Sequence, residues 1–383
     1  MSVGEWEWDE ILDRYEAISS DYWDGVKDDH LSEIQDDEQE VDRIQTEYRN
    51  KRNESKSLTE QQKTVISGFL PGNTIANSTG WEFRAIEPLR NLDSESPDLV
   101  IGHPETGSIL AVTMLRQRER PETAINRVTS AATTIRSNTR LLSDEINMSV
   151  DDRGVECVLI VPESADRRSA EAIEDLEGSG DLTEEIYLWK IVETDKEKIE
   201  AHTQIGSRDE DECLPDGDLG EYLSQGIEVA KSVHSLPDFF AESHHEIIAE
   251  HTVGEMVSQR KRDGGQITHF SKSDFEDYLR TTLSHSNSAN VASERAELLL
   301  KRWEEMGLIE SITDGQTRLD DGSDYYRFDT GTRTAKNTMG AVRSDYTELA
   351  VDFELNVEAT RRTLREYIEE NGEQASLNQF ETV

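Results

Sequence analysis

Residues 97–116 read PDLVIGHPETGSILAVTMLR, which is two short apolar runs separated by a polar step. Each run has the length and the apolar character of a β-strand. Glu105-Thr106-Gly107 between them is a turn signal, and Ser94 and Ser96 lie in a further turn-rich stretch before the first run. This stretch therefore predicts two neighbouring strands within a larger sheet.

The residues on either side continue an alternation of helices and strands. A helix is predicted from Thr59 to Leu70, followed by the strand WEFRAIEPL; after the two central runs, Pro121 suits the first turn of a long amphipathic helix. The run ECVLIVP then predicts a buried strand, RRSAEAIEDLE a helix and EEIYLWKIV another strand. The order α, β, β, β, α, β, α, β predicts an α/β domain over residues 59–204.

The remaining sequence divides into four further segments. Residues 1–58 predict an acidic helical extension docked on the next domain; a partner-binding arm and a DNA mimic are the alternatives. Residues 205–221 are acidic and turn-rich, which is typical of a linker. Residues 222–330 predict a mostly α domain that starts with helices near 222–234 and 237–262, and residues 331–383 form a C-terminal helical segment. The fold class is thus α/β plus mostly α, in several domains.

The composition indicates a salt-adapted protein. Among 383 residues, 82 Asp and Glu face 40 Lys and Arg, giving a net charge of −42 that is spread along the chain. Such a dispersed acidic surface resembles that of halophilic proteins, whose self-repulsion is screened by salt; a dedicated basic partner is the alternative. Cys157 and Cys213 form no disulfide or metal pattern. Neither a signal peptide nor a membrane-spanning run is present, so we expect a cytoplasmic protein without membrane association.

The order of residues 59–163, with Pro97-Asp98 opening the second strand, resembles the PD-(D/E)XK restriction-endonuclease-like superfamily. The resemblance implies an acidic metal ligand on the second strand, matched by Asp98, and an acid followed two positions later by lysine on the third. Thr113 and Leu115 occupy those two places. Threonine cannot replace a carboxylate that holds Mg²⁺, and leucine cannot stabilise the developing charge. We therefore expect no catalysis and no cofactor.

A relocated active site is the alternative at this position. It would use Asp98 as the metal ligand, together with groups that are nearby in the sequence. These candidates are Glu82, Glu87, Glu119 and Arg116. Only in that case would the chain need Mg²⁺ and act as a metal-dependent DNA nuclease.

Arginines are concentrated between residues 116 and 140, against the acidic background. Guanidinium groups pair with phosphate, and in the resembled fold this strand end and helix border the cleft that receives nucleic acid. Internal ion pairs with the acidic surface are the alternative. The six candidates, opposed by Glu119 and Glu122 only, are Arg116, Arg118, Arg120, Arg127, Arg136 and Arg140.

Residues 237–329 resemble a winged helix domain, with three helices and then a β-hairpin. In the last helix, Leu299, Leu300 and Trp303 belong to a packing face, and Gly307 ends the helix. Such a helix can enter the major groove of DNA, although winged helices also bind partner proteins. The candidate DNA contacts are Arg295, Lys301 and Arg302 on the helix and Arg318 and Arg327 on the wing.

The C-terminal segment ELAVDFELNVEATRRTLREYI resembles a helix-turn-helix, with a turn at Leu355-Asn356. Arg361, Arg362 and Arg365 would then face outward to contact DNA. A terminal helical hairpin that makes a dimer interface is the alternative.

Two further patterns carry no site. His244, His245 and His251 lie on an amphipathic helix without a fourth ligand, so we expect surface side chains rather than a metal centre. Neither GxxxxGK[ST] nor GxGxxG occurs, so no nucleotide binding is expected.

These patterns together predict a non-catalytic DNA-binding subunit, with a degenerate nuclease-like domain and a winged helix domain, in genome defence, restriction or chromosome maintenance. We expect it to form a homo-oligomer or to belong to a larger complex. The alternatives are the nuclease with a relocated site and an adaptor whose winged helices bind a larger ATPase or a second copy of the chain.

Overall fold

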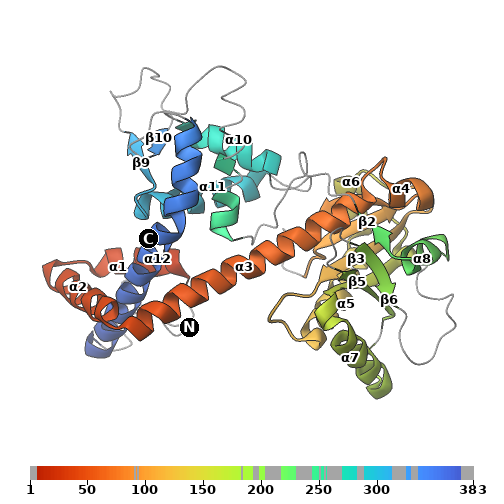
Figure 1. Cartoon of the computed structure of the whole chain (residues 1–383), viewed down its shortest axis with the longest axis horizontal. Coiled ribbons are helices and arrows are strands. Elements are labelled where there is room, and N and C mark those ends of the chain that lie inside the picture. Colours follow the sequence, from red (N-terminus) through yellow and green to blue (C-terminus); the bar gives the residue numbers. More distant parts are fainter. Residues whose placement is uncertain are drawn as a thin grey trace. The chain divides into compact units, whose positions relative to one another are not determined.

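The computed structural model describes residues 7–89, 92, 95–182, 184–192, 198–202, 217–229, 244–249, 252–253, 256, 270–282, 289–312, 325–328 and 335–371. The chain divides into two compact units, both drawn in Figure 1. The helical unit comprises Met1–Asn53, His244–Leu279 and Asn290–Val383, and the sheet unit comprises Glu54–Ser243 and Arg280–Ala289. Within the described residues, no helix is both long enough and apolar enough to cross a bilayer.

A mixed seven-stranded sheet forms the centre of the sheet unit. Its strands are β1 (Glu82–Ile86), β2 (Leu99–His103), β3 (Ser108–Met114), β4 (Val155–Pro162), β5 (Ile186–Val192), β6 (Lys198–His202) and β7 (Ile227–Glu228). They lie side by side in chain order. The neighbours are antiparallel from β1 to β3, parallel from β3 to β5, and antiparallel from β5 to β7. The predicted α/β character of this region is confirmed.

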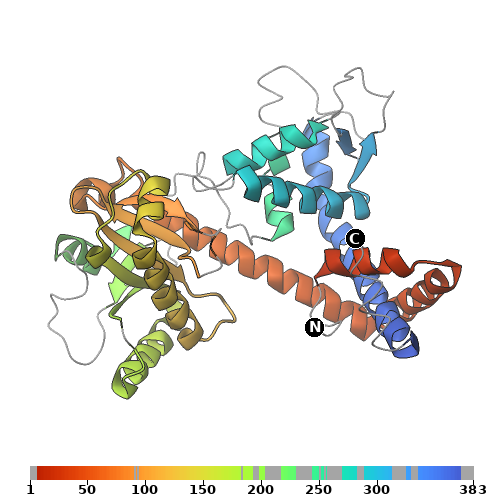
Figure 2. The ribbon, with the colours of Figure 1, turned by 180° about the vertical axis from the view of Figure 1, so that it is seen from behind.

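Helices cover both faces of this sheet (Figure 2). One face carries α5 (Pro121–Ser137), α6 (Thr139–Ile146) and α7 (Asp166–Ser179), and the other carries the end of α3 (Glu38–Phe69), α4 (Thr74–Thr79) and α8 (Gly217–Ser224). Two short 3-10 turns, Asp152–Gly154 and Glu163–Ala165, flank β4. Because both faces are covered, the central strands are apolar at nearly every position.

Local signals predict the turns of this unit correctly. Gly107, between β2 and β3, has a φ of 76°, and its N–H donates to the carbonyl oxygen of His103 over 2.9 Å. A side chain there would meet the main-chain oxygen of Ser149 at 3.0 Å, so the tight turn needs glycine. Pro121 stands in the first turn of α5, as predicted.

Two predicted boundaries of the sheet unit are wrong. The boundary at residues 58–59 falls inside α3, because residues 38–67 contain neither glycine nor proline to end the helix. The linker predicted at 205–221 gives way to α8 at residue 217, and the helix predicted at 222–234 contains β7, which pairs with β6. Residues 217–229 therefore complete the sheet unit, whereas residues 205–216 lie outside the described part.

The helical unit is built mainly from both ends of the chain. Besides the start of α3 and a helical stretch at 245–249, its elements are α1 (Trp8–Ile18), α2 (Asp21–Asp36), β8 (Phe270–Ser271), α10 (Lys272–Thr282), α11 (Ala289–Glu305), β9 (Ile309–Ile312), β10 (Tyr325–Phe328) and α12 (Ala335–Asn371). The three short strands form an antiparallel sheet in the order β8-β10-β9. Phe275 of α10 and Trp303 of α11 pack edge to face at 5.1 Å.

The helix and hairpin predicted between residues 289 and 328 are confirmed as elements. Helix α11 ends where Gly307 takes a φ of 68°, and the N–H of Leu308 returns to the carbonyl oxygen of Trp303 at 2.8 Å. Strands β9 and β10 then pair antiparallel. Residues 313–324, which include Arg318, lie outside the described residues.

The C-terminal helix-turn-helix prediction is wrong. Helix α12 runs without a break through Leu355 and Asn356, whose segment has no glycine or proline. The Asn356 side chain donates to the carbonyl oxygen of Asp352, one turn earlier in the helix, so this residue is accommodated within the helix.

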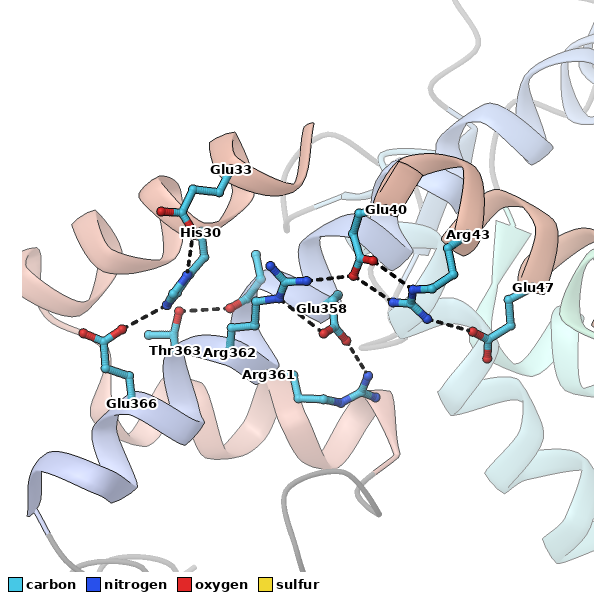
Figure 3. Close-up of polar contacts among 11 residues, drawn as sticks. His30, Glu33, Glu40, Arg43, Glu47, Glu358, Arg361, Arg362, Thr363 and Glu366 are labelled. Atoms are coloured by element: carbon cyan, nitrogen blue, oxygen red, sulfur yellow. Dashed lines mark hydrogen bonds and ion pairs between the residues drawn. The ribbon is translucent and has the colours of Figure 1, made fainter. Parts of the chain in front are cut away.

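The N-terminal helices pack on α12. Trp23 of α2 and Tyr367 of α12 meet edge to face at 5.2 Å, and Trp8 of α1 meets Phe353 of α12 at 5.5 Å. Figure 3 shows the polar edge of this packing, where Arg362 reaches Glu40 at 2.7 Å. The predicted extension is therefore an integral part of the helical unit.

Candidate nucleic-acid interface

Asp98 lies buried at the start of β2, with 4% of its surface exposed. Its Oδ2 accepts a hydrogen bond of 2.6 Å from the main-chain N–H of Met114 on β3. Burial raises the pKa of this carboxyl, and the attraction of Arg127 opposes the rise. The residue predicted as a possible metal ligand is therefore held inside the sheet unit by its neighbouring strand.

Thr113 and Leu115 stand on β3 and directly after it, at positions that belong to the core. Thr113 is fully buried, and Leu115 packs in the apolar cluster beneath α5. Both lie on the face of β3 that carries Ala111, because side chains alternate along a strand. The two positions where the resembled family carries an acid and a lysine thus provide no charge here.

Arg127 of α5 lies between the acidic side chains at this end of β3. Its Nε and Nη2 donate to Glu119 Oε1 and Oε2 at 2.8 and 3.1 Å, and its Nη1 lies 3.3 Å from Asp98 Oδ1. Nη2 also donates to the carbonyl oxygen of Met114 at 2.9 Å. Burial by itself lowers the pKa of Arg127, but Asp98 and Glu119 raise it above its ordinary value. Arg127 is therefore a charged, largely buried residue whose guanidinium nitrogens all donate to internal partners, which is the alternative of internal ion pairs; its contact with DNA stays a prediction.

The other candidates for a relocated active site do not gather around Asp98 in the same way. Glu82 pairs with Arg84 at 2.6 Å and lies opposite Gly102, toward the far end of β2. The main-chain N–H of Glu87 donates to the carbonyl oxygen of Asp98, and that of Arg116 donates to Glu119 Oε2. The charge of Arg116 also acts to lower the pKa of Asp98. Of the acidic candidates, Glu119 shares an ion-pair partner with Asp98, because Arg127 lies between the two carboxylates.

Mg²⁺ does not fit this arrangement. All four carboxylate oxygens of Asp98 and Glu119 already accept hydrogen bonds from Arg127 or from the main chain. Octahedral Mg²⁺ needs free oxygen ligands at short distance. In the described part of the chain, no group of three His, Cys, Asp or Glu is placed to hold a metal ion.

A basic hollow of about 620 Å³ borders this locked pair. Arg118 and Arg120, before α5, and Arg168, in the first turn of α7, line it together with two acids, Glu119 and Glu122. Because β3 and β4 are parallel, the helices that follow them begin at the same edge of the sheet. We call this depression the arginine hollow. All three arginine side chains are exposed, and no ion pair joins them to another described residue.

Sequence reasoning found two of these arginines and missed the third. Arg168 is about fifty residues from Arg118, and its only signal was the Arg167-Arg168 pair at the start of a predicted helix. Arg167 pairs with Glu171 one turn later, at 2.8 Å, while Arg168 lines the hollow.

Arg136 and Arg140 lie away from this edge. Helix α5 is 17 residues long, about 25 Å, and runs back along the sheet. Arg136 donates to the carbonyl oxygen of Val155, the first residue of β4, and pairs with Glu184 at 2.5 Å. Arg140 follows on α6 and is exposed. The six predicted arginines therefore do not form one surface.

The basic residues of the helical unit are largely engaged in internal ion pairs. Arg302 is 5% exposed and pairs with Glu354, and Lys301 pairs with Asp13 at 2.6 Å. Arg361 pairs with Glu358, and Arg362 with Glu358 and Glu40 (Figure 3). Arg295 is half-buried, whereas Arg365 is exposed. The predicted outward arginine row on the C-terminal helix is therefore corrected, and Arg302 is not a surface residue.

The two described histidines of the predicted surface helix are half-buried rather than exposed. His244 and His245 stack with ring centroids 4.1 Å apart, and the Nδ1 atom of His245 lies 3.0 Å from the Tyr346 hydroxyl. Burial lowers the pKa of His244 to about 3 and that of His245 well below its ordinary value. Both rings are therefore uncharged at neutral pH; His251 lies outside the described residues.

No protein-family model matches this chain, and neither a curated protein nor a solved structure is significantly similar to it.

Proposed function

We propose that this chain is a non-catalytic DNA-binding subunit and that DNA phosphates bind in the arginine hollow. The observation that carries the proposal is the convergence of the exposed side chains of Arg118, Arg120 and Arg168 in one depression, where none of the three guanidinium groups forms an ion pair with a described residue. On a chain with a net charge of −42, three exposed arginines at one edge form a local attraction for an anion.

The position of the hollow supports a nucleic-acid ligand. It lies at the carboxyl edge of parallel strands, where open α/β sheets bind their ligands. The α, β, β, β, α, β order around it is the order of the PD-(D/E)XK superfamily, in which this edge receives nucleic acid. Helices α5 and α7 also begin here, and the positive end of each helix dipole favours an anion.

The absence of catalysis follows from the residues beside the hollow. Thr113 and Leu115 are uncharged core residues, and Asp98 and Glu119 are paired to Arg127. A metal-dependent nuclease needs carboxylates that are free to hold the cation and position a water molecule. The relocated nuclease therefore has little support from the geometry.

A second role is proposed for the helical unit. Its order of a helical stretch, β8, α10, α11, β9 and β10 resembles that of a winged helix. The basic residues Lys301 and Arg302 on α11 are paired with Asp13 and Glu354 of the same unit. This observation favours binding of a partner protein by the helical unit over DNA contact by α11.

The test is duplex DNA binding by fluorescence anisotropy across a KCl series, on the full chain. Arg118→Ala, Arg120→Ala and Arg168→Ala should each weaken binding severalfold for every sequence, because phosphate contacts are not sequence-specific. Each lost contact should also reduce the slope of log affinity against log salt by about 0.9.

Arg140→Ala is the matched control, because it removes the same charge from an exposed site away from the hollow. It should leave both affinity and salt slope unchanged. Equal losses of DNA affinity for Arg140→Ala and Arg118→Ala would show that only the net charge matters, and would reject the arginine hollow as the binding site. Plasmid cleavage with Mg²⁺ that Asp98→Ala abolishes would establish the nuclease instead.

A further inference from the structure

We infer that the Arg127 guanidinium takes the place of a divalent cation at the edge of the sheet, so that phosphate binds beside it without a metal. The inference rests on the proposed function for the choice of phosphate as ligand. Its geometric part, which concerns Asp98, Glu119 and Met114, stands independently of DNA.

Three oxygen-bearing groups from separate parts of the sheet unit converge on Arg127. They are the Asp98 carboxylate at the start of β2, the Met114 carbonyl at the end of β3, and the Glu119 carboxylate before α5. Two carboxylates and a main-chain carbonyl are the hard oxygen ligands that Mg²⁺ and Mn²⁺ prefer. In this chain a planar guanidinium fork fills the space between them.

The charges make a cation necessary at this point. The side chains of Asp98 and Glu119 are only 6% and 10% exposed, and that of Arg127 is 15% exposed. Two buried carboxylates without a counter-charge would be strongly destabilising. Arginine stays protonated across the physiological range and is tethered to the chain, so neither chelation nor dilution can remove it.

The substitution also affects the arginine hollow. Glu119 lines the hollow and is the acid held by two hydrogen bonds from Arg127. A phosphate bound to Arg118, Arg120 and Arg168 therefore meets Glu119 as a neutralised carboxylate, whereas the exposed Glu122 also lines the hollow. Arg127 thereby supports anion binding without touching the anion, which makes it a positioning residue.

The experiment measures Mn²⁺ binding by electron paramagnetic resonance in molar KCl, on the full chain without DNA. The parent and Asp98→Asn should bind Mn²⁺ identically, because only scattered surface acids contribute. Arg127→Ala should gain one saturable site, and Arg127→Ala with Asp98→Asn should lack it. Arg136→Ala, on the same helix, should gain none.

Two results would overturn the inference: a parent site that Asp98→Asn removes, or a folded Arg127→Ala that gains no site. If Arg127→Ala does not fold, Arg127→Gln, which keeps most of the side-chain volume, replaces it in the Mn²⁺ titration. The comparison of the parent with Asp98→Asn does not depend on either variant, and a parent Mn²⁺ site that Asp98→Asn removes would overturn the inference by itself. Parent DNA binding should be equal in EDTA and in Mg²⁺. Hollow variants that bind DNA as tightly as the parent would reject the proposed function and leave the Mn²⁺ result unchanged.

Discussion

Replacement of Arg127 by alanine should destabilise the sheet unit far more than replacement of Arg136 on the same helix. Arg127 donates to Glu119, Asp98 and the Met114 carbonyl, and its removal takes away the ion-pair partner that the two largely buried carboxylates share. Removing one partner of a buried ion pair costs about 3–5 kcal/mol. Arg136 and Glu184 are 30% and 27% exposed, so Arg136→Ala should cost about 1 kcal/mol.

The pH dependence separates this electrostatic cost from a loss of packing. Burial raises the pKa of Asp98, and Arg127 is the strongest influence that lowers it, so the variant's pKa rises further. A carboxyl with a raised folded-state pKa stabilises the fold below its unfolded pKa, and this contribution is lost as pH rises through the folded value. The deficit of Arg127→Ala should therefore be largest near neutral pH and should shrink as pH falls toward 4.

The assay is urea denaturation in molar KCl, followed by hydrogen exchange of β2 and β3 peptides, which reports on the sheet unit alone. Equal losses for Arg127→Ala and Arg136→Ala, or an Arg127→Ala deficit that is constant between neutral and acid pH, would refute the reasoning.

Other expected outcomes follow from the remaining contacts. Because the folded pKa of His244 is about 3, its neutral ring stabilises the fold above pH 6.5, and this contribution is lost on acidification. Between pH 6 and pH 4 the free energy of unfolding of the parent should therefore fall by about 1.4 kcal/mol per pH unit relative to that of His244→Asn, measured in matched denaturation series. Trp23→Ala should cost the helical unit about 3–5 kcal/mol, measured by hydrogen exchange of α12, because Trp23 is buried against Tyr367. The melting temperature should rise with KCl from the millimolar to the molar range as self-repulsion is screened, and a flat calorimetric series would contradict this.

Much of the sheet unit could be predicted because its signals are local. Apolar runs such as residues 97–116 have strand length, and Gly107 and Pro121 mark a turn and a helix start through backbone geometry alone. The absence of the acid and the lysine could also be predicted, because Thr113 and Leu115 lack the required charges whatever surrounds them.

The extent of two helices could not be predicted from the same signals. Helical periodicity continues through the predicted boundary at residues 58–59 and through Leu355-Asn356, and a turn was assigned where no residue ends the helix. Hydrophobic periodicity also does not predict which element of the fold an apolar helix face will pack against. The sequence thus indicated N-terminal helices, while the packing of Trp23 on Tyr367, more than 300 residues away, belongs to the tertiary structure.

The roles of the arginines were likewise decided by tertiary structure. The sequence by itself determined that basic side chains gather at residues 116–140, in an acidic chain. It could not determine that Arg127 lies between Asp98 and Glu119 while Arg118 stays exposed beside Arg168. An ion pair depends on which side chains from separate elements come within about 4 Å of each other. That proximity is set by the order of the strands and by the way α5 packs on the sheet. Neither the strand order nor this packing can be predicted from the local sequence.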